Sequence, residues 1–236
     1  KIEHEAKVVL ERSHQLKTRF FTNITHELRT PLTLMLGPLQ DIIGKADISG
    51  PIRNKLEGVH KNVQRLSHLV NQLLDFRKLE TDHMKMSVVE GDIVDFLKEI
   101  YFAFREETTK RNIDFIFESE NESLKCWYDS DKLEKVFFNL LSNALKFTAD
   151  YGLIKVIVEE TRDQIRITVS DNGEGIDEER MEHIFERFYE RNSLNYSNYG
   201  VGIGLALSKQ LIDLHHGDIY AQNNEDSGTS FVVELL

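Results

Sequence analysis

This chain has a single cysteine, no long apolar run and no excess of positive charge, and each of these features excludes something. The single cysteine, Cys126, cannot form a disulfide within the chain, which fits a reducing compartment. No run approaches the ~20 apolar residues that a helix needs to cross a bilayer, and no signal peptide is evident. Lysine and arginine total 29 against 40 acidic residues, a net charge of −11, so this segment is not expected to contact nucleic acid.

Composition otherwise indicates a folded protein with one large or two modest domains. Apolar residues make up 40% of the 236 positions, enough for real cores, and charged residues make up 29%. The chain begins at Lys1 without a methionine and already in a helical pattern. We therefore expect it to be a piece of a longer protein, and the lack of a membrane span then describes only this piece.

The first third of the chain has a helical rhythm of apolar residues that extends to about Leu79. In its second half the spacing alternates between four and three, which is a heptad seam: Ile52, Leu56, Val59, Val63, Leu66, Val70, Leu73 and Phe76. A similar stripe precedes it, and Gly44 and Pro51 mark the end of one helix and the start of the next. A two-helix hairpin cannot bury such a seam alone. We predict a C2-symmetric homodimer with a four-helix bundle, the alternative being an intramolecular lid over the seam.

After Glu80 the rhythm changes to one typical of an α+β layer, with helices on one face of a mixed sheet. Helices are predicted at residues 93–110, 132–147 and 203–215, with Asp131 and Glu134 as a capping box for the second. Strands are predicted at residues 113–118, 124–128, 154–160, 164–170, 219–223 and 229–235, the third and fourth of them antiparallel. The predicted domains are residues 1–83 and 84–236.

His26 stands on the solvent face of the first helix, two residues from both Ile24 and Leu28. Neutral imidazole is a competent nucleophile near neutral pH, and Glu27 beside it can take or orient the ring proton. Pro31 should loosen the helix at this turn. A solvated histidine is the plain alternative for such a position.

The second domain contains polar and glycine-rich elements that suit a nucleotide. Asn139, Asn143 and Lys146 share one helix face, where amide oxygens suit Mg²⁺ and a lysine suits phosphate. Asp171, in Asp-Asn-Gly-Glu-Gly-Ile, can accept a hydrogen bond from the adenine amino group and would reject guanine. Gly200-Val-Gly-Ile-Gly-Leu opens a helix and can present N–H groups to phosphates, and the polar run 190–199 before it is predicted to form a lid.

The string His26-Glu27-Leu-Arg-Thr30-Pro-Leu closely resembles the H-box of sensor histidine kinases, and the later elements resemble that family's N, G1, F, G2 and G3 boxes. The resemblance implies a dimeric helical hairpin followed by an α+β sandwich of the histidine kinase, Hsp90 and gyrase ATPase type. It implies ATP and Mg²⁺ as cofactors, His26 as phosphoacceptor, Glu27 as base, and Thr30 in dephosphorylating a partner response regulator. The string also looks like that of hybrid sensors, which carry their own receiver domain. The resemblance implies that this chain is the cytoplasmic portion of an inner-membrane sensor.

The resemblance also implies a set of nucleotide contacts. Asn143 should ligate Mg²⁺ with help from Asn139, and Asp171 should contact adenine. The other residues expected at the nucleotide are Lys146, Phe147, Gly173, Gly175, Ile176, Phe185, Arg187, Phe188, Arg191, Gly200, Gly202, Gly204, Leu205 and Thr229.

Two departures from the family pattern stand out. Val201 replaces the commoner threonine of the second glycine box, and Glu190 stands where many relatives carry a phosphate-binding arginine. Arg187 and Arg191 are both candidates for that contact. An ATPase of the gyrase type, a protein-serine kinase on the same fold, and an ATP-binding relay without phosphotransfer are the rival interpretations. The first lacks its catalytic glutamate at Asn139, and the other two leave His26 and Glu27 unexplained.

Overall fold

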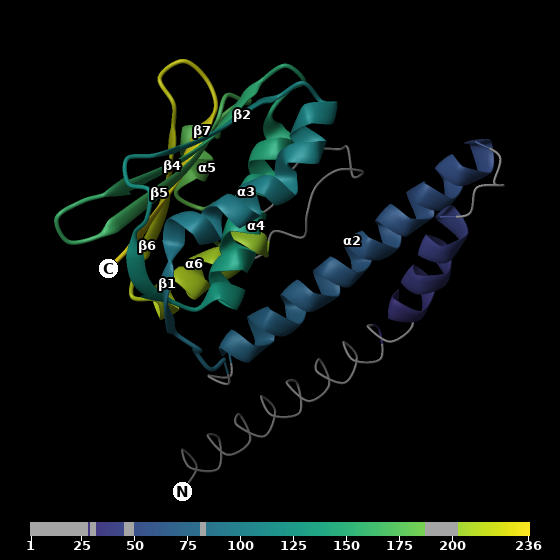
Figure 1. The fold of residues 1–236 in the computed structure, drawn as a ribbon, viewed down its shortest axis with the longest axis horizontal. Coiled ribbons are helices and arrows are strands. Elements are labelled where there is room, and N and C mark those ends of the chain that lie inside the picture. The colour runs from purple at the N-terminus through teal and green to yellow at the C-terminus, as the bar shows by residue number, and fades with distance from the viewer. Residues whose placement is uncertain (1–27, 29–31, 45–49, 81–83, 187–202) are drawn as a thin grey trace, which may run out of the picture. The chain divides into compact units, whose positions relative to one another are not determined.

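The structure is a computed structural model that describes residue 28 and residues 32–44, 50–80, 84–186 and 203–236 (Figure 1). The chain divides into two compact units, Lys1–Met84 and Lys85–Leu236, and each is described by itself. Within the described ranges, no helix is long and apolar enough to span a membrane.

The described part of the first unit is helical, as predicted. Residues 32–43 form a helix that ends at Gly44, whose N–H donates to the carbonyl of Gln40 (3.0 Å). The long helix α2 (Gly50–Glu80) follows, with Pro51 in its first turn, where a missing N–H costs nothing.

The second unit contains eleven elements in the described residues. Their bounds are β1 (Val89–Asp92), α3 (Ile93–Lys110), β2 (Asp114–Ser119), β3 (Lys125–Tyr128), α4 (Ser130–Phe147), β4 (Leu153–Glu160), β5 (Ile165–Asp171), α5 (Glu178–Met181), α6 (Gly204–Leu214), β6 (Asp218–Asn223) and β7 (Thr229–Leu235). The predicted helices and strands are all present, within two residues at each end. β1 and the short helix α5 were not predicted from the sequence.

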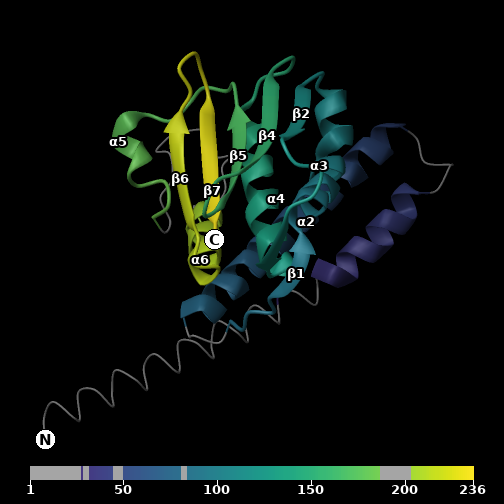
Figure 2. The same ribbon diagram turned by 60° about the vertical axis from the view of Figure 1, so that its left-hand side comes forward.

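Five strands form a mixed sheet in the order β2-β4-β5-β7-β6. β2 runs parallel to β4, and the other neighbours are antiparallel. The helices α3, α4 and α6 cover one face (Figures 1 and 2). Their buried residues meet alternate residues of the strands to make the core, which includes Val94, Leu133, Phe137, Leu140, Ile154, Val156, Ile167, Leu211 and Ile212. This confirms the predicted layer of helices on one face of a mixed sheet.

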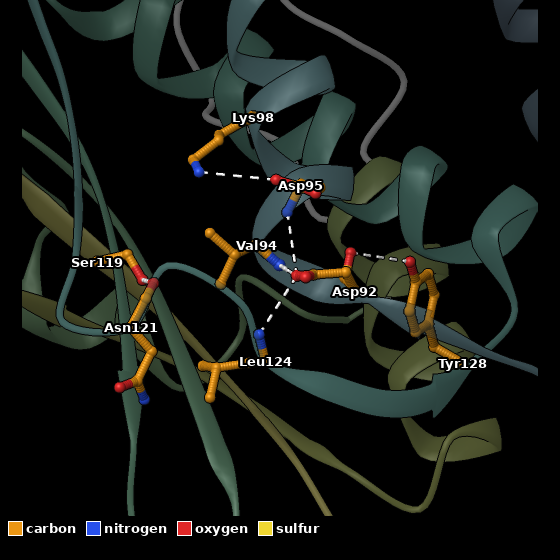
Figure 3. A network of polar contacts seen from close by, with 8 residues as sticks. All are labelled: Asp92, Val94, Asp95, Lys98, Ser119, Asn121, Leu124 and Tyr128. Carbon is orange, nitrogen blue, oxygen red and sulfur yellow. Dashed lines mark hydrogen bonds and ion pairs between the residues drawn. The ribbon is translucent and has the colours of Figure 1, made fainter.

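The small sheet of β1 and β3 is tied to the start of α3 by Asp92 (Figure 3). Oδ1 of Asp92 accepts from the backbone N–H groups of Val94 (3.0 Å), Asp95 (3.3 Å) and Leu124 (3.3 Å). The Tyr128 hydroxyl donates to the Asp92 carbonyl (3.3 Å). One N-cap side chain therefore joins β1, α3 and the segment before β3.

The helix α4 begins differently from the prediction. Its N-cap is Asp129, which is buried and whose Oδ1 accepts from the N–H of Lys132 (3.2 Å). Asp131, predicted as the cap, is exposed inside the first turn. The prediction of an Asp131–Glu134 capping box is wrong because two aspartates stand near the boundary, and Asp129 alone has extended backbone at the end of β3.

Candidate functional site

Asp171, the last residue of β5, is the buried charge around which the candidate site is built. Its side chain is 6% exposed, and its Oδ1 accepts from the N–H of Gly173 (2.8 Å). Burial raises the pKa of the Asp171 carboxyl, while hydrogen bonds from the backbone of Gly173 and Thr229 act in the opposite direction. A buried carboxylate with a fixed orientation is a selective hydrogen-bond acceptor.

The turn Asp171–Ile176 (the 171–176 turn) approaches its neighbours so closely that side chains are excluded. A Cβ at Gly173 would lie 2.5 Å from the carbonyl oxygen of Phe147, at the end of α4. Gly175 has φ +76°, a conformation that favours glycine. The turn is thereby set against the C-terminal end of α4.

The polar face of α4 carries Asn139, Asn143 and Lys146 in differing environments. Nδ2 of Asn139 donates to Oγ of Ser208 in α6 (3.0 Å). Asn143 is half-buried and makes no hydrogen bond with the described residues. Nζ of Lys146 lies 4.7 Å from the ring centroid of Phe147, and both side chains are exposed. Asn143 is thus the residue of this face whose amide is available to a ligand.

The start of α6 reaches the same face of α4. A Cβ at Gly204 would lie 2.4 Å from Oδ1 of Asn139, so only glycine allows this approach. Ser208, one turn later, donates to the carbonyl of Gly204 (3.1 Å) and accepts from Asn139. Leu205 is half-buried next to these residues in the chain. The first N–H groups of a helix have no partner within the helix, so this helix start suits an anion.

Arg111, which was not predicted from the sequence as a site residue, holds the C-terminal end of α4. Its guanidinium donates to the carbonyls of Leu145 and Thr148 (2.6 Å for the second) and pairs with Asp150 (2.8 Å). A cation at this end also complements the helix dipole. Arg111 therefore fixes the turn of α4 that carries Lys146 and Phe147.

Replacing Arg111 with alanine is expected to destabilise the second unit by about 1–3 kcal/mol, because two carbonyls lose a charged donor. Asp150→Ala is the matched control: it removes only the exposed partner of the ion pair and should cost less than about 1 kcal/mol. Urea unfolding followed by circular dichroism measures both. Equal losses in the two variants would show that the ion pair, and not the carbonyl contacts, accounts for the stability.

Of the remaining predicted site residues, Phe185 and Ile176 lie among the described residues and the others do not. The ring of Phe185 packs edge-on against Phe231 of β7, with centroids 6.4 Å apart. Ile176 exchanges two backbone hydrogen bonds with the side chain of Asn223. The predicted residues His26, Glu27, Thr30, Arg187, Phe188, Arg191, Gly200 and Gly202 lie outside the described residues.

The described residues contain no group of three or more histidine, cysteine, aspartate or glutamate side chains that could hold a metal ion. Amide oxygen, which Asn143 offers, is a hard ligand of the kind that Mg²⁺ prefers. The geometry combines a selective acceptor at Asp171, an available amide at Asn143, and a helix start at Gly204. That combination suits a purine nucleotide with a chain of phosphates.

Comparison with known proteins agrees with this geometry. Residues 128–236 match the family model of the histidine kinase-, DNA gyrase B- and HSP90-like ATPases, and residues 16–82 match the His kinase A phospho-acceptor domain. Histidine kinase P4 of Formosa agariphila is 43% identical over 230 residues, which are 95% of this chain and 17% of that protein. The hybrid signal transduction histidine kinase D of Dictyostelium discoideum is 34% identical over 227 residues, 94% of this chain and 15% of that protein. The chain thus spans less than a quarter of the length of these relatives.

Solved structures give the same result. The catalytic domain of histidine kinase ThkA is 34% identical with a TM-score of 0.58, over 64% of this chain and 97% of that one. A crystal structure of ThkA in complex with response regulator protein TrrA matches 97% of this chain and 65% of that one, at 26% identity and a TM-score of 0.64. The relatives, the two family models and the fold agree, and the chain belongs to the histidine kinase family.

Proposed function

We propose that this chain binds ATP with Mg²⁺ in its second unit and transfers the γ-phosphoryl group to His26. The group would then pass to an aspartate on a response-regulator receiver domain, and Thr30 would assist its removal from the regulator. The observation that carries the proposal is the buried Asp171 at the end of β5, oriented by Gly173 within a domain of the ATPase family.

Asp171 supports adenine as the base that is bound. A carboxylate accepts a hydrogen bond from the exocyclic amino group of adenine, whereas guanine presents a carbonyl at that position. The same contact with guanine would place two acceptors against each other. Phe147 and Ile176 are the apolar residues that we assign to the faces of the base.

The triphosphate is assigned to the polar face of α4 and the start of α6. Asn143, with Asn139 as a second ligand, would hold Mg²⁺, which lowers the charge repulsion of the triphosphate when bound. The Asn139 amide is engaged between α4 and α6, since its Nδ2 donates to Ser208 and its Oδ1 lies against Gly204, and Asn143 is therefore assigned as the principal ligand. Lys146 and the glycines Gly200, Gly202 and Gly204 would contact phosphate, together with Arg187 or Arg191.

Asn143→Ala is expected to weaken binding of ATP in the presence of Mg²⁺ by about tenfold or more, the equivalent of about 1.4 kcal/mol. Ser142→Ala, one residue away and exposed, should bind like the wild type. Isothermal titration calorimetry with and without EDTA measures both. The proposal requires that the difference between the variants shrink in EDTA; an equal difference without Mg²⁺ would contradict the metal role.

The chemical step is an in-line displacement at the γ-phosphorus. A ring nitrogen of His26 forms the new P–N bond, the bond to the β–γ bridging oxygen breaks, and ADP leaves. Glu27 takes or orients the proton on the other ring nitrogen. Catalysis then comes from positioning and charge stabilisation.

Asn139 also bears on the rival ATPase function. The gyrase-type enzymes have a water-activating glutamate at this position, and an amide cannot act as that base. In this structure its amide nitrogen is bonded to Ser208, between α4 and α6. Hydrolysis of ATP by water should therefore be slow.

The first unit is assigned as the dimerisation segment, residues 1–83. In the single chain the heptad positions Ile52 (54%), Val59 (49%) and Leu66 (47%) are exposed, and Leu34 (69%) is exposed on the preceding helix. Pairing of two hairpins would cover such residues in a four-helix bundle. Sedimentation equilibrium tests the assignment, and a chain that stays monomeric at micromolar concentration would contradict it.

The partner and the setting follow from the same proposal. ThkA forms a complex with the response regulator TrrA, and we propose a receiver domain as partner of this chain as well, on a separate protein or on the same one. ATP as donor places the reaction in the cytoplasm, and we assign the chain to the cytoplasmic portion of a membrane sensor. The test is to mix the labelled, phosphorylated chain with purified receiver domains. We expect label to pass to at least one of them, and failure with all of them would contradict the proposed partner.

A further inference from the structure

The 171–176 turn is held by two consecutive asparagines at the end of the edge strand β6. Asn223 is the last residue of β6 and Asn224 follows it, and neither belongs to the elements that the sequence analysis assigned to the nucleotide. Both side chains bond to this turn across about 50 residues of chain.

Asn223 fixes the exit of the turn. Its Oδ1 accepts from the N–H of Ile176 (2.9 Å), and its Nδ2 donates to the carbonyl of the same residue (2.6 Å). A primary amide presents a donor and an acceptor side by side, so it can pair with both backbone groups of one residue as a neighbouring strand would. A Cβ at Gly175 would lie 3.3 Å from Oδ1 of Asn223, so the amide also lies against the glycine with positive φ.

Asn224 fixes the entry of the turn. Its Nδ2 donates to the carbonyl of Asp171 (2.7 Å), and its Oδ1 accepts from the Ser230 hydroxyl (2.6 Å). Oγ of Ser230 is also 2.9 Å from Oγ of Ser170, the residue before Asp171. The backbone of the residue that carries the buried carboxylate is thus bonded to a chain of side-chain hydrogen bonds.

These contacts leave the direction of the Asp171 carboxylate little freedom. Its own backbone carbonyl is bonded to Asn224, its Oδ1 to the N–H of Gly173, and the turn closes on Asn223 at Ile176. Discrimination between a donor and an acceptor on a base depends on such fixed geometry, because hydrogen bonds weaken steeply as they bend or lengthen.

We propose that Asn223 and Asn224 are positioning residues that set the preference of this site for adenine over guanine nucleotides. The inference rests on the proposed function, in which Asp171 receives the adenine amino group. Neither asparagine touches the nucleotide. They act through the turn, by holding the carboxylate where adenine fits and guanine does not.

The test compares Asn223→Ala and Asn224→Ala with wild type in the 236-residue chain. Dissociation constants for ATP and GTP with Mg²⁺ are measured by calorimetry, and the unliganded melting temperature is measured alongside. Gln222→Ala is the matched control, since it removes an exposed side-chain amide that has no hydrogen bond with the described residues. Asn223 is exposed, so its variant should fold even if that of the half-buried Asn224 does not.

In Asn223→Ala we expect the ATP dissociation constant to rise about five- to tenfold, because the turn loses two hydrogen bonds. The GTP dissociation constant should change less than about twofold. The ratio of the two constants should therefore fall, while Gln222→Ala keeps the wild-type ratio. A wild-type ratio in Asn223→Ala, with or without a lower melting temperature, would overturn the inference and leave a structural role only. A wild-type chain with no preference for ATP would overturn the proposed function itself, and this inference with it.

Discussion

Asp171→Asn is expected to weaken ATP binding by about 10- to 150-fold, since a hydrogen bond to a charged group contributes about 1.5–3 kcal/mol. The change also brings the new amide N–H₂ towards the adenine amino group, so that donor faces donor. Asp163→Asn is the matched control. It makes the same chemical change at an exposed residue just before the start of β5. Calorimetric titration with ATP and Mg²⁺ measures both, and Asp163→Asn should bind as wild type does.

The stability of Asp171→Asn separates loss of the contact from loss of the fold. Burial raises the pKa of Asp171, so the folded chain holds this proton more tightly than the unfolded chain does. Stability from this group is then greatest at low pH and is lost as pH rises from 3.8 through the raised pKa. An amide carries no such penalty at pH 7, which offsets the weaker acceptance from the backbone of Gly173 and Thr229, so the unliganded melting temperature should change little. A lowered melting temperature together with retained affinity for ATP would contradict the assigned role.

Gly228→Ala is expected to destabilise the second unit by about 3 kcal/mol, from backbone strain and overlap together. Gly228 has φ +89°, and a Cβ there would lie 2.0 Å from the carbonyl oxygen of Asp171. Since the overlapping atom is backbone, the loop before β7 must move away from the 171–176 turn. That movement also breaks the contact between Asp171 and Thr229, so ATP affinity should fall as well.

Thermal unfolding measures the Gly228→Ala effect, which corresponds to a melting temperature lower by about 6–12 °C for a domain of this size. Asp226→Ala, which removes an exposed side chain of the same loop, should stay within about 0.5 kcal/mol of wild type. If both variants lose the same stability, the close approach at Gly228 is not the cause.

The long elements could be predicted from the sequence because their apolar periodicity extends over many residues. The bounds of α3 agree with the prediction at both ends, and α4 differs by two residues at its start. β1 could not be predicted, because its four residues, Val-Glu-Gly-Asp, do not alternate and form a strand only by pairing with β3. At α4 the sequence offers Asp129 and Asp131, and burial of the first decides which one caps the helix.

In the candidate site, too, some features could be predicted from the local sequence and others depend on contacts between distant residues. Motifs local in sequence, such as the turn after Asp171 and the polar face around Asn143, were identified as candidates from residue type and spacing. The residues that support them were not, because their partners are far along the chain. Arg111 reaches Leu145 and Thr148 across 34 and 37 residues, and Asn223 reaches Ile176 across 47. No periodicity or local motif reports such pairs.

Incubation with γ-³²P-ATP and Mg²⁺ tests the central claim most directly. Wild type is compared with His26→Ala and with His60→Ala, which removes a histidine from α2 instead. The proposal predicts an acid-labile, alkali-stable label on wild type and on His60→Ala, and none on His26→Ala. Label that persists in His26→Ala, or free phosphate released without any labelled protein, would contradict it.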